Sequence, residues 1–377
     1  MNKTDKRIKV AFPHMGNVYI AWASALKKLG IEPVIPPRTN KKTLELASKY
    51  SPDSICLPYK LVLGNFLQAI ENGADCVAMI SSPGICRLGE YGQSIRNVMK
   101  DLNCESKYVQ LDLYGGFKSI YDFLKEISGV KNPVRIIRAI NLAVRKVFIV
   151  DRLENLFSYY RARELKQGTA EKHFKKALQI IYDTDRTISL KKAERIASEE
   201  IKKTEIDKNR DVLKVDITGE IFLVQDPYSN QNIEKELGRM GVQTRRSLTV
   251  SGFIKDAIIP KMFQKDETHL ERSERMAKPY LMRDIGGDAL ESVSDVAFAN
   301  SKGTDGIIHV SPFTCMPEIM SQNIFPTMRE NCEIPILTLI LDEQTGRAGY
   351  ITRLEAFVDL MRRRKMYKKK NKTPQTV

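Results

Sequence analysis

Six cysteines are the side chains of this sequence best suited to bind a metal or to act as nucleophiles, and three of them have similar surroundings. We expect Cys56 to end a short strand, Cys86 to lie in the loop SSPGICRLGEYG, and Cys315 to follow a strand in IIHVSPFTCMPE. In two of these segments a proline, Pro58 or Pro317, follows one residue later and suits the first turn of a helix. Helix N-termini favour thiolates, because the exposed N–H groups and the macrodipole stabilise negative charge.

Thiolates at these places could hold an iron–sulfur cluster. The sequence has no C-x-x-C pair, so a zinc ribbon or a thioredoxin-type site is not expected. Three thiolates are one short of the usual four for an iron–sulfur cube, which would leave one iron open to water or substrate. The alternative is that these cysteines are buried as small apolar residues. Cys76 and Cys332, at the edges of predicted strands, fit that alternative, and Cys104 fits either.

Hydrophobic periodicity divides the chain into four parts. Short apolar runs alternate with helical patterns over 1–116, which predicts a first Rossmann-like α/β domain. Strand signals are sparse over 117–209, so a helical middle region is expected there. The alternation resumes over 210–361 and predicts a second Rossmann-like α/β domain. The remaining segment, 362–377, is expected to be a basic disordered tail.

The predicted fold is therefore α/β: two Rossmann-like parallel-sheet domains with a helical middle region and a cluster site in the cleft between them. In detail, we expect strands at 54–57 and 220–224. A T-x-x-E capping box formed by Thr352 and Glu355 is expected to start the last helix.

Four further residues are candidates for the site. Lys60 and Arg87 lie close in sequence to the proposed ligands and could offset cluster charge or steer an acidic partner. The alternative for Lys60 is an ordinary surface cation. Glu318 is placed to cap the helix after Cys315 and could carry a proton. His14, in the exit loop of the first strand, could donate one.

Composition excludes several other classes of protein. The longest apolar stretch is about eight residues, near 334–341, whereas a membrane-spanning helix needs roughly 20. The first residues lack the apolar region of a signal peptide, so a cytoplasmic location is expected. Net charge is +15, but +8 of it comes from the sixteen residues after Met361. Charge alone therefore does not indicate a nucleic-acid-binding protein.

Six segments together carry a family resemblance, and they occur in order along both α/β units. They are AFPHMGN at 11–17, ICLPYKLVLGNF at 55–66, GADCVAMISSPGICRLGEYG at 73–92, TGEIFLVQDPYSN at 218–230, GTDGIIHVSPFTCMPE at 303–318 and LDEQTGRAGYITRLEAFVDL at 341–360. With them the chain resembles the 2-hydroxyacyl-CoA dehydratase and benzoyl-CoA reductase D-component superfamily. More narrowly, it is similar to the branch labelled CoA-protein activase, or activase-related protein.

The resemblance implies one [4Fe–4S] or related cluster, held by Cys56, Cys86 and Cys315 between the two domains. A double-cubane cluster is the alternative. It also implies a partner, a separate ATPase of the sugar-kinase and actin fold that supplies low-potential electrons. Consistent with a separate ATPase, the chain contains neither the phosphate-binding loop G-x-x-x-x-G-K-[ST] nor the dinucleotide-binding turn G-x-G-x-x-G. No ATP site of its own is therefore expected. No segment matches the acyl-CoA pocket of the dehydratases.

Three functions follow as hypotheses. The first is an oxygen-sensitive iron–sulfur protein that accepts electrons from the activase and reduces or radicalises a small substrate, as a reductase or a dehydratase-like lyase. The second is a non-enzymatic electron relay or regulatory partner of the activase. The third is a nucleic-acid binder that uses the basic tail, which we rank last because the tail lies outside the matching segments. A homodimer, or a heterodimer with a related subunit, stays open.

Overall fold

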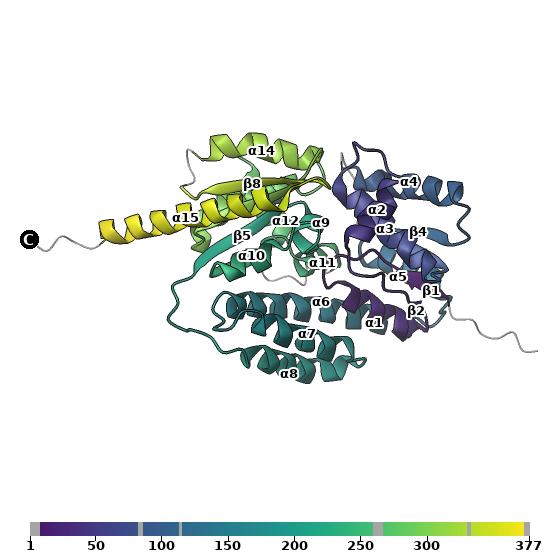
Figure 1. The fold of residues 1–377 in the computed structure, drawn as a ribbon. Coiled ribbons are helices and arrows are strands. Elements are labelled where there is room, and N and C mark those ends of the chain that lie inside the picture. Colours follow the sequence, from purple (N-terminus) through teal and green to yellow (C-terminus); the bar gives the residue numbers. More distant parts are fainter. Residues whose placement is uncertain (1–7, 82–85, 113–114, 259–266, 330–332, 373–377) are drawn as a thin grey trace, which may run out of the picture.

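The computed structural model describes residues 8–81, 86–112, 115–258, 267–329 and 333–372 (Figure 1). Its described strands form two four-stranded sheets in which all neighbours run parallel, so two parallel-sheet α/β units are confirmed. The strands are β1 (Lys9–Ala11), β2 (Glu32–Pro33), β3 (Cys76–Ser81) and β4 (Lys107–Asp112) in the first sheet, and β5 (Leu213–Gly219), β6 (Val242–Arg246), β7 (Gly306–Pro312) and β8 (Ile336–Leu341) in the second.

The second sheet repeats the strand order of the first. The orders are β2-β1-β3-β4 and β6-β5-β7-β8, so in each sheet the direction of winding reverses between the two middle strands. Such a switch point leaves a crevice at the carboxyl ends of the strands, where doubly wound proteins bind their ligands. The exits of β1 and β3, and those of β5 and β7, are therefore the places where a site is expected.

Helices cover both faces of the first sheet, which explains its apolar strands. Val77 and Met79 of β3 point to one face, and Cys76 and Ala78 point to the other. Cys76 is buried in this second layer of core, as predicted. The covering helices are α1 (Tyr19–Leu29), α2 (Lys41–Ser48), α3 (Leu57–Glu71), α4 (Leu88–Asp101) and α5 (Gly116–Ser128).

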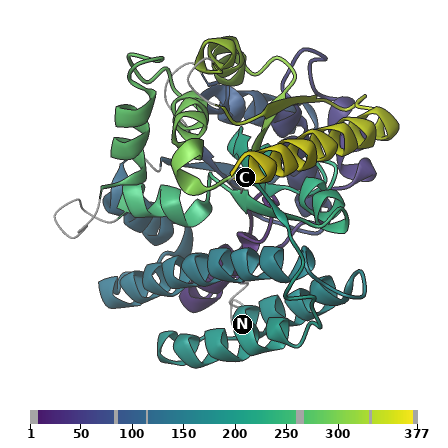
Figure 2. The same ribbon diagram turned by 90° about the vertical axis from the view of Figure 1, so that its left-hand side faces the viewer.

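Three helices form a layer that spans both α/β units (Figures 1 and 2): α6 (Pro133–Arg161), α7 (Thr169–Tyr182) and α8 (Leu190–Lys202). The first half of α6 packs on the first sheet through Ile136 and Ile140. Its second half stacks Phe157 on Phe174 of α7 with ring centroids 4.2 Å apart. The end of α6 also reaches the second sheet, where the Ser158 hydroxyl donates to the Thr244 carbonyl oxygen at 2.6 Å. The predicted helical middle thus joins the two units.

The second unit contains the remaining helices. Its central strand β7 is buried at all seven positions, as expected for a strand covered on both faces. Among the described residues no helix combines the length and the apolar character needed to cross a membrane. The helices are α9 (Ile221–Gln225), α10 (Ile233–Arg239), α11 (Val250–Ile258), α12 (His269–Ala277), α13 (Ala289–Phe298), α14 (Met316–Met328) and α15 (Arg347–Lys372).

Two of the predicted strands are wrong. Residues 54–56 form a turn that leads into α3, which begins at Leu57 directly after Cys56 and has Pro58 in its first turn. Residues 220–224 fall largely in α9. The strand β5 ends at Gly219, and the Glu220 side chain accepts the Leu223 N–H at 2.9 Å and caps the new helix.

The last helix also differs from the expectation. It begins at Arg347, so Thr352 lies inside it and donates its hydroxyl to the Ala348 carbonyl oxygen. The segment predicted to be disordered continues α15 to Lys372, which extends away from the body of the molecule in Figure 1. Lys365 and Lys369 both pair with Asp211, at 2.6 and 2.7 Å, and offset the repulsion between like charges along the helix. Residues 373–377 and Cys332 lie outside the described residues.

Candidate functional site

The switch points of the two sheets meet at one cavity of about 50 Å³. The exits of β1 and β3 contribute Met15 and Cys86, and the exits of β5 and β7 contribute Glu220 and Cys315. Cys56, at the start of α3, completes the set of three cysteines. The structure therefore brings together on one surface the three thiols that the sequence singled out, from segments far apart in the chain.

Two of these cysteines occupy the same position on a helix. Cys56 is the N-cap residue of α3 and Cys315 is the N-cap residue of α14, each with a proline in the first turn. Cys315 follows β7 as predicted, but Cys56 follows a turn and not a strand. Cys86 lies one residue before Arg87, the N-cap residue of α4. All three thiols thus stand at helix N-termini.

Arg87 ties the three cysteine-bearing loops together. Its guanidinium donates to the Thr314 carbonyl oxygen at 2.6 Å and to the Ser54 carbonyl oxygen at 3.1 Å. Ser54 precedes Cys56 by two residues, and Thr314 directly precedes Cys315. The Thr314 hydroxyl also donates to the Ser54 carbonyl oxygen at 3.1 Å. Arg87 lines the cavity. Its hydrogen bond to Thr314 connects the first unit to the second, and its hydrogen bond to Ser54 fixes the loop before Cys56.

Lys60 is a second bridge between the units. Its side chain is 2% exposed, so it is not an ordinary surface cation. The ammonium pairs with Glu343, which follows β8, at 2.5 Å and donates to the Asp53 carbonyl oxygen at 3.3 Å. Lys60 does not line the cysteine cavity. It fixes the first turn of α3, and with it Cys56, against the second sheet.

Burial keeps the thiols protonated in the chain alone. It is the largest effect on all three sulfurs, raising the pKa of Cys56, the pKa of Cys86 to about 12, and the pKa of Cys315. Backbone N–H groups of Tyr59, Leu88 and Glu318 lower these pKa values, as expected at helix N-termini, but by less. The helix ends thus favour the thiolates as expected, but burial is the larger effect in the chain alone.

Two acids lie at the same cavity or next to it: Glu220 lines the cavity, and Asp288 accepts the Ile221 N–H at 2.9 Å. Burial and the neighbouring Asp288 raise the pKa of Glu220 to about 8. Burial, followed by the charge of Glu318, raises the pKa of Asp288 to about 7. Glu220 is thus mainly protonated at neutral pH. Its negative charge, if formed, would further disfavour thiolates at Cys56, Cys86 and Cys315.

Glu318 and His14 do not line this cavity. Glu318 is fully buried beneath Cys315, where it accepts a hydrogen bond from Ser292 at 2.9 Å and contacts the His309 ring at 2.5 Å. No side-chain cap of α14 is formed, so the predicted capping role is wrong. His14 lies in a different cavity, and burial with the charge of Arg38 lowers its pKa to about 4. The His14 ring is therefore neutral at pH 7, and the imidazolium form that could act as an acid is not populated there.

The donor set suits a cluster better than a single ion. Among the residues that the structure describes, no three His, Cys, Asp or Glu side chains are arranged to hold one metal ion. The three thiols instead approach one cavity from separate loops, and a cluster binds its thiolates through different irons. The remaining lining is largely apolar, with Met79, Ile80 and Phe222, which would limit access of water.

Several residues at the site were not foreseen. The Tyr91 hydroxyl and the Cys56 sulfur are 2.7 Å apart and share a hydrogen bond. Gly287, with φ of +70°, brings its backbone beside Cys86, so that an added Cβ would lie 2.6 Å from the Pro317 ring. The glycines in G-E-Y-G at 89–92 and in I-G-G-D at 285–288 are the sequence features that could have indicated these residues, because glycines often mark a close approach of the backbone.

These observations define the class of protein: two doubly wound α/β units joined by a helical layer, with a cysteine-lined cavity between their switch points. A family model described as CoA enzyme activase uncharacterised domain matches residues 11–247, more than half of the chain. The chain belongs to this family. The matched region contains Cys56 and Cys86 and ends before Cys315. Comparison with curated proteins gives no match.

Proposed function

We propose that this chain is an iron–sulfur protein of the 2-hydroxyacyl-CoA dehydratase type, in which Cys56, Cys86 and Cys315 hold a [4Fe–4S] cluster. The observation that supports it most is the meeting of these three thiols on one cavity at facing switch points. The family description, which names a CoA enzyme activase, supports an ATP-dependent activase as the electron-donating partner. Reduction or radical formation on a small substrate is the proposed outcome.

The chain's own residues have clear tasks in this proposal. A bound cluster would supply one-electron chemistry. Cys56, Cys86 and Cys315 must each release a proton before they bind iron, since burial holds them as thiols. Arg87 contributes positive charge beside the sulfurs and keeps their loops in register. Glu220, protonated at neutral pH, avoids adding negative charge to the same place.

The size of the cavity favours a second candidate, a non-enzymatic electron relay. Its volume of about 50 Å³ is far below the roughly 300–1,000 Å³ of small-molecule pockets. A compact inorganic group fits such a space, and a CoA thioester does not. In this arrangement of the loops, a substrate would need another entrance. A relay would need none, because electrons cross a thin layer of protein without direct contact.

The decisive experiment measures iron and acid-labile sulfide per chain after anaerobic purification, with EPR of the dithionite-reduced protein. About four of each per chain indicates one cube, and about eight indicates a double cubane. Cys56→Ala, Cys86→Ala and Cys315→Ala should each lose most of the iron. Cys76→Ala is the matched control, because Cys76 is buried in the core of the first sheet and should not affect iron.

No iron after anaerobic reconstitution, or full iron in all three variants, would reject the cluster. The two candidates separate when the loaded protein is mixed with its activase and ATP. A relay passes electrons to an added acceptor at the same rate with or without CoA thioesters. An enzyme consumes one of them.

A further inference from the structure

A second and larger cavity lies where the three structural units meet. Its volume is about 270 Å³, close to the lower limit of about 300 Å³ for small-molecule pockets. The first unit contributes the exits of β1 and β2, the helical layer contributes α6 and α7, and the second unit contributes the residues around α10 and the end of β6. It shares no residue with the cysteine cavity.

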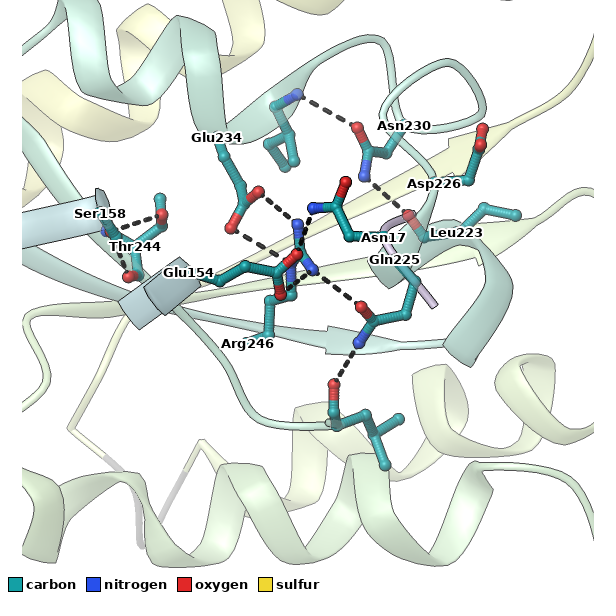
Figure 3. Close-up of polar contacts among 12 residues, drawn as sticks. Asn17, Glu154, Ser158, Leu223, Gln225, Asp226, Asn230, Glu234, Thr244 and Arg246 are labelled. Carbon is teal, nitrogen blue, oxygen red and sulfur yellow. Dashed lines mark hydrogen bonds and ion pairs between the residues drawn. The ribbon is translucent and has the colours of Figure 1, made fainter. Parts of the chain in front are cut away.

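The floor of this cavity is a closed polar network centred on Arg246 (Figure 3). The guanidinium pairs with Glu234 at 2.7 Å and with Glu154 at 2.8 Å, and it donates to the Gln225 side chain at 2.7 Å. Asn17 of the first unit donates to Glu154 at 2.7 Å and completes the link. Since its partners satisfy Arg246, this residue holds the three units together and is not free to bind a ligand.

Arg161 differs from Arg246. Its guanidinium lies over the Phe157 ring, 3.8 Å from the centroid, at the end of α6. Among the residues that the structure describes, it makes no hydrogen bond or close ion pair. Arg161 is half-buried, and burial lowers its pKa although the charges of Glu234 and Glu171 act in the opposite direction. Neither carboxylate forms an ion pair with the guanidinium within 4 Å in the described part of the chain. A guanidinium that stacks on an aromatic ring keeps its N–H edge available for a two-point contact with an oxyanion.

The rest of the lining leaves the cavity positive. Lys175 and Lys235 share Glu171 at 2.8 and 3.6 Å, and Arg38 stands exposed at the rim without an ion pair within the described part of the chain. Burial raises the pKa of Asp226 to about 6, so this carboxyl is still mainly ionised at neutral pH and the excess of positive charge in the lining is small. His14 is neutral at pH 7 because its pKa is lowered to about 4. The cations of the lining therefore outnumber its carboxylates.

We propose that this cavity binds a small organic anion, with a carboxylate or phosphate group on Arg161 and its carbon skeleton against Phe174 and Leu178. The apolar side chains lie on α7, next to the stacked ring of Phe157. An oxyanion would supply the hydrogen-bond acceptors that Arg161 lacks. Because such a ligand touches all three units, its binding stabilises their arrangement. The proposal does not depend on a cluster, since the cysteines lie elsewhere.

Isothermal titration calorimetry at constant ionic strength tests the proposal with five probes: inorganic phosphate, pyrophosphate, glycerol 3-phosphate, succinate and citrate. We expect at least one probe to bind saturably and to raise the unfolding temperature, with NaCl as the blank. The phosphate and carboxylate probes show which oxyanion is preferred. Arg161→Gln should weaken that binding about tenfold to a hundredfold, because a charge-assisted hydrogen bond is lost.

Arg138→Gln is the matched control, since Arg138 is an exposed arginine of the same helix outside the cavity. It should leave the affinity unchanged. If Arg161→Gln does not fold, Arg38→Gln at the exposed rim replaces it and should weaken binding about threefold or more. Absence of binding by all five probes overturns the proposal. The proposal is also overturned if Arg138→Gln weakens binding as much as Arg161→Gln or Arg38→Gln does. Such a result would show that only the net charge of the protein affects the affinity.

Discussion

The guanidinium of Arg87, in the first α/β unit, donates hydrogen bonds to both the carbonyl oxygen and the hydroxyl of Thr314 in the second, at 2.6 and 2.8 Å. Each of the two residues is the direct neighbour of a cavity cysteine. Thr314 has a φ of +65°, a backbone conformation that residues other than glycine rarely adopt. Its strain is offset by the Arg87 contacts, so the separation of Cys86 and Cys315 depends on this pair.

Replacing Arg87 by glutamine should therefore loosen the cavity. We expect the free energy of unfolding to fall by about 1–3 kcal/mol, because two carbonyl groups and a hydroxyl lose a charged donor. Alkylation of Cys315 by a neutral reagent, followed by mass spectrometry, should become at least several-fold faster. Arg96→Gln, on the exposed side of α4, is the control. Equal alkylation rates in the two variants would show that Arg87 does not restrain the loops.

Lys60 and Glu343 provide an independent test of the contact between the units. Glu343→Gln removes the negative charge beside the buried ammonium, although the amide oxygen can still accept a hydrogen bond, and should destabilise the chain by about 1–3 kcal/mol. The estimate is modest because the Glu343 side chain is 29% exposed and water screens the pair.

Lys60→Met combined with Glu343→Gln should cost less than the sum of the single changes, since both charges are then removed. Urea unfolding of the four proteins measures this coupling. Glu355→Gln, an exposed acid of α15, should be neutral. Strictly additive effects would show that the pair contributes nothing to the interface.

The sequence placed two of the three cysteines at equivalent positions, because Pro58 and Pro317 mark helix starts next to Cys56 and Cys315. The strand expected before Cys56 is absent, so the prediction from strand ends is confirmed for Cys315 and wrong for Cys56. That all three cysteines share one site was implied by the family resemblance. The cluster itself stays a prediction.

The partners of the charged residues could not be predicted in the same way. Lys60 pairs with Glu343, which lies 283 residues away, and no local pattern indicates such a contact. The thiol pKa values depend on burial and on Glu220, which become visible only when both sheets are placed. The basic end of α15 was predicted to be disordered because its partner Asp211 lies 154 residues before Lys365 and is not indicated by any local pattern.

Close packing of α2 against α3 predicts an unusual response to a helix-favouring substitution. A Cβ at Gly64 would lie 2.1 Å from the Thr43 carbonyl oxygen, which is backbone and cannot move aside cheaply. Gly64→Ala should therefore destabilise the chain by about 2 kcal/mol or more, although alanine is intrinsically favoured in a helix by about 1 kcal/mol.

Gly349→Ala is the matched control, because Gly349 lies in α15 with nothing within 4 Å of an added Cβ. That variant should gain up to about 1 kcal/mol. Thermal and urea unfolding of the two variants measure the difference. A stabilised Gly64→Ala protein would mean that α2 and α3 are farther apart than described.

His14 should make stability depend on pH in the mildly acidic range. Its pKa falls from 6.5 to about 4 on folding, mainly through burial and secondly through the charge of Arg38. Between these values the unfolded chain binds a proton at this ring and the folded chain does not, so stability rises with pH. The contribution is complete above pH 6.5 and is lost as the pH falls toward 4. From pH 6.5 to 4.5 this amounts to roughly 2–3 kcal/mol.

Urea unfolding of the wild type and of His14→Gln, measured from pH 4.5 to 7.5, tests this expectation. The difference between the two curves should change by about 1.4 kcal/mol per pH unit below pH 6 and become flat above pH 7. Asp226, whose pKa is raised to about 6, acts in the opposite direction but is present in both proteins and cancels in the difference. Parallel curves across the whole range would show that His14 takes up a proton in the folded chain as readily as in the unfolded one.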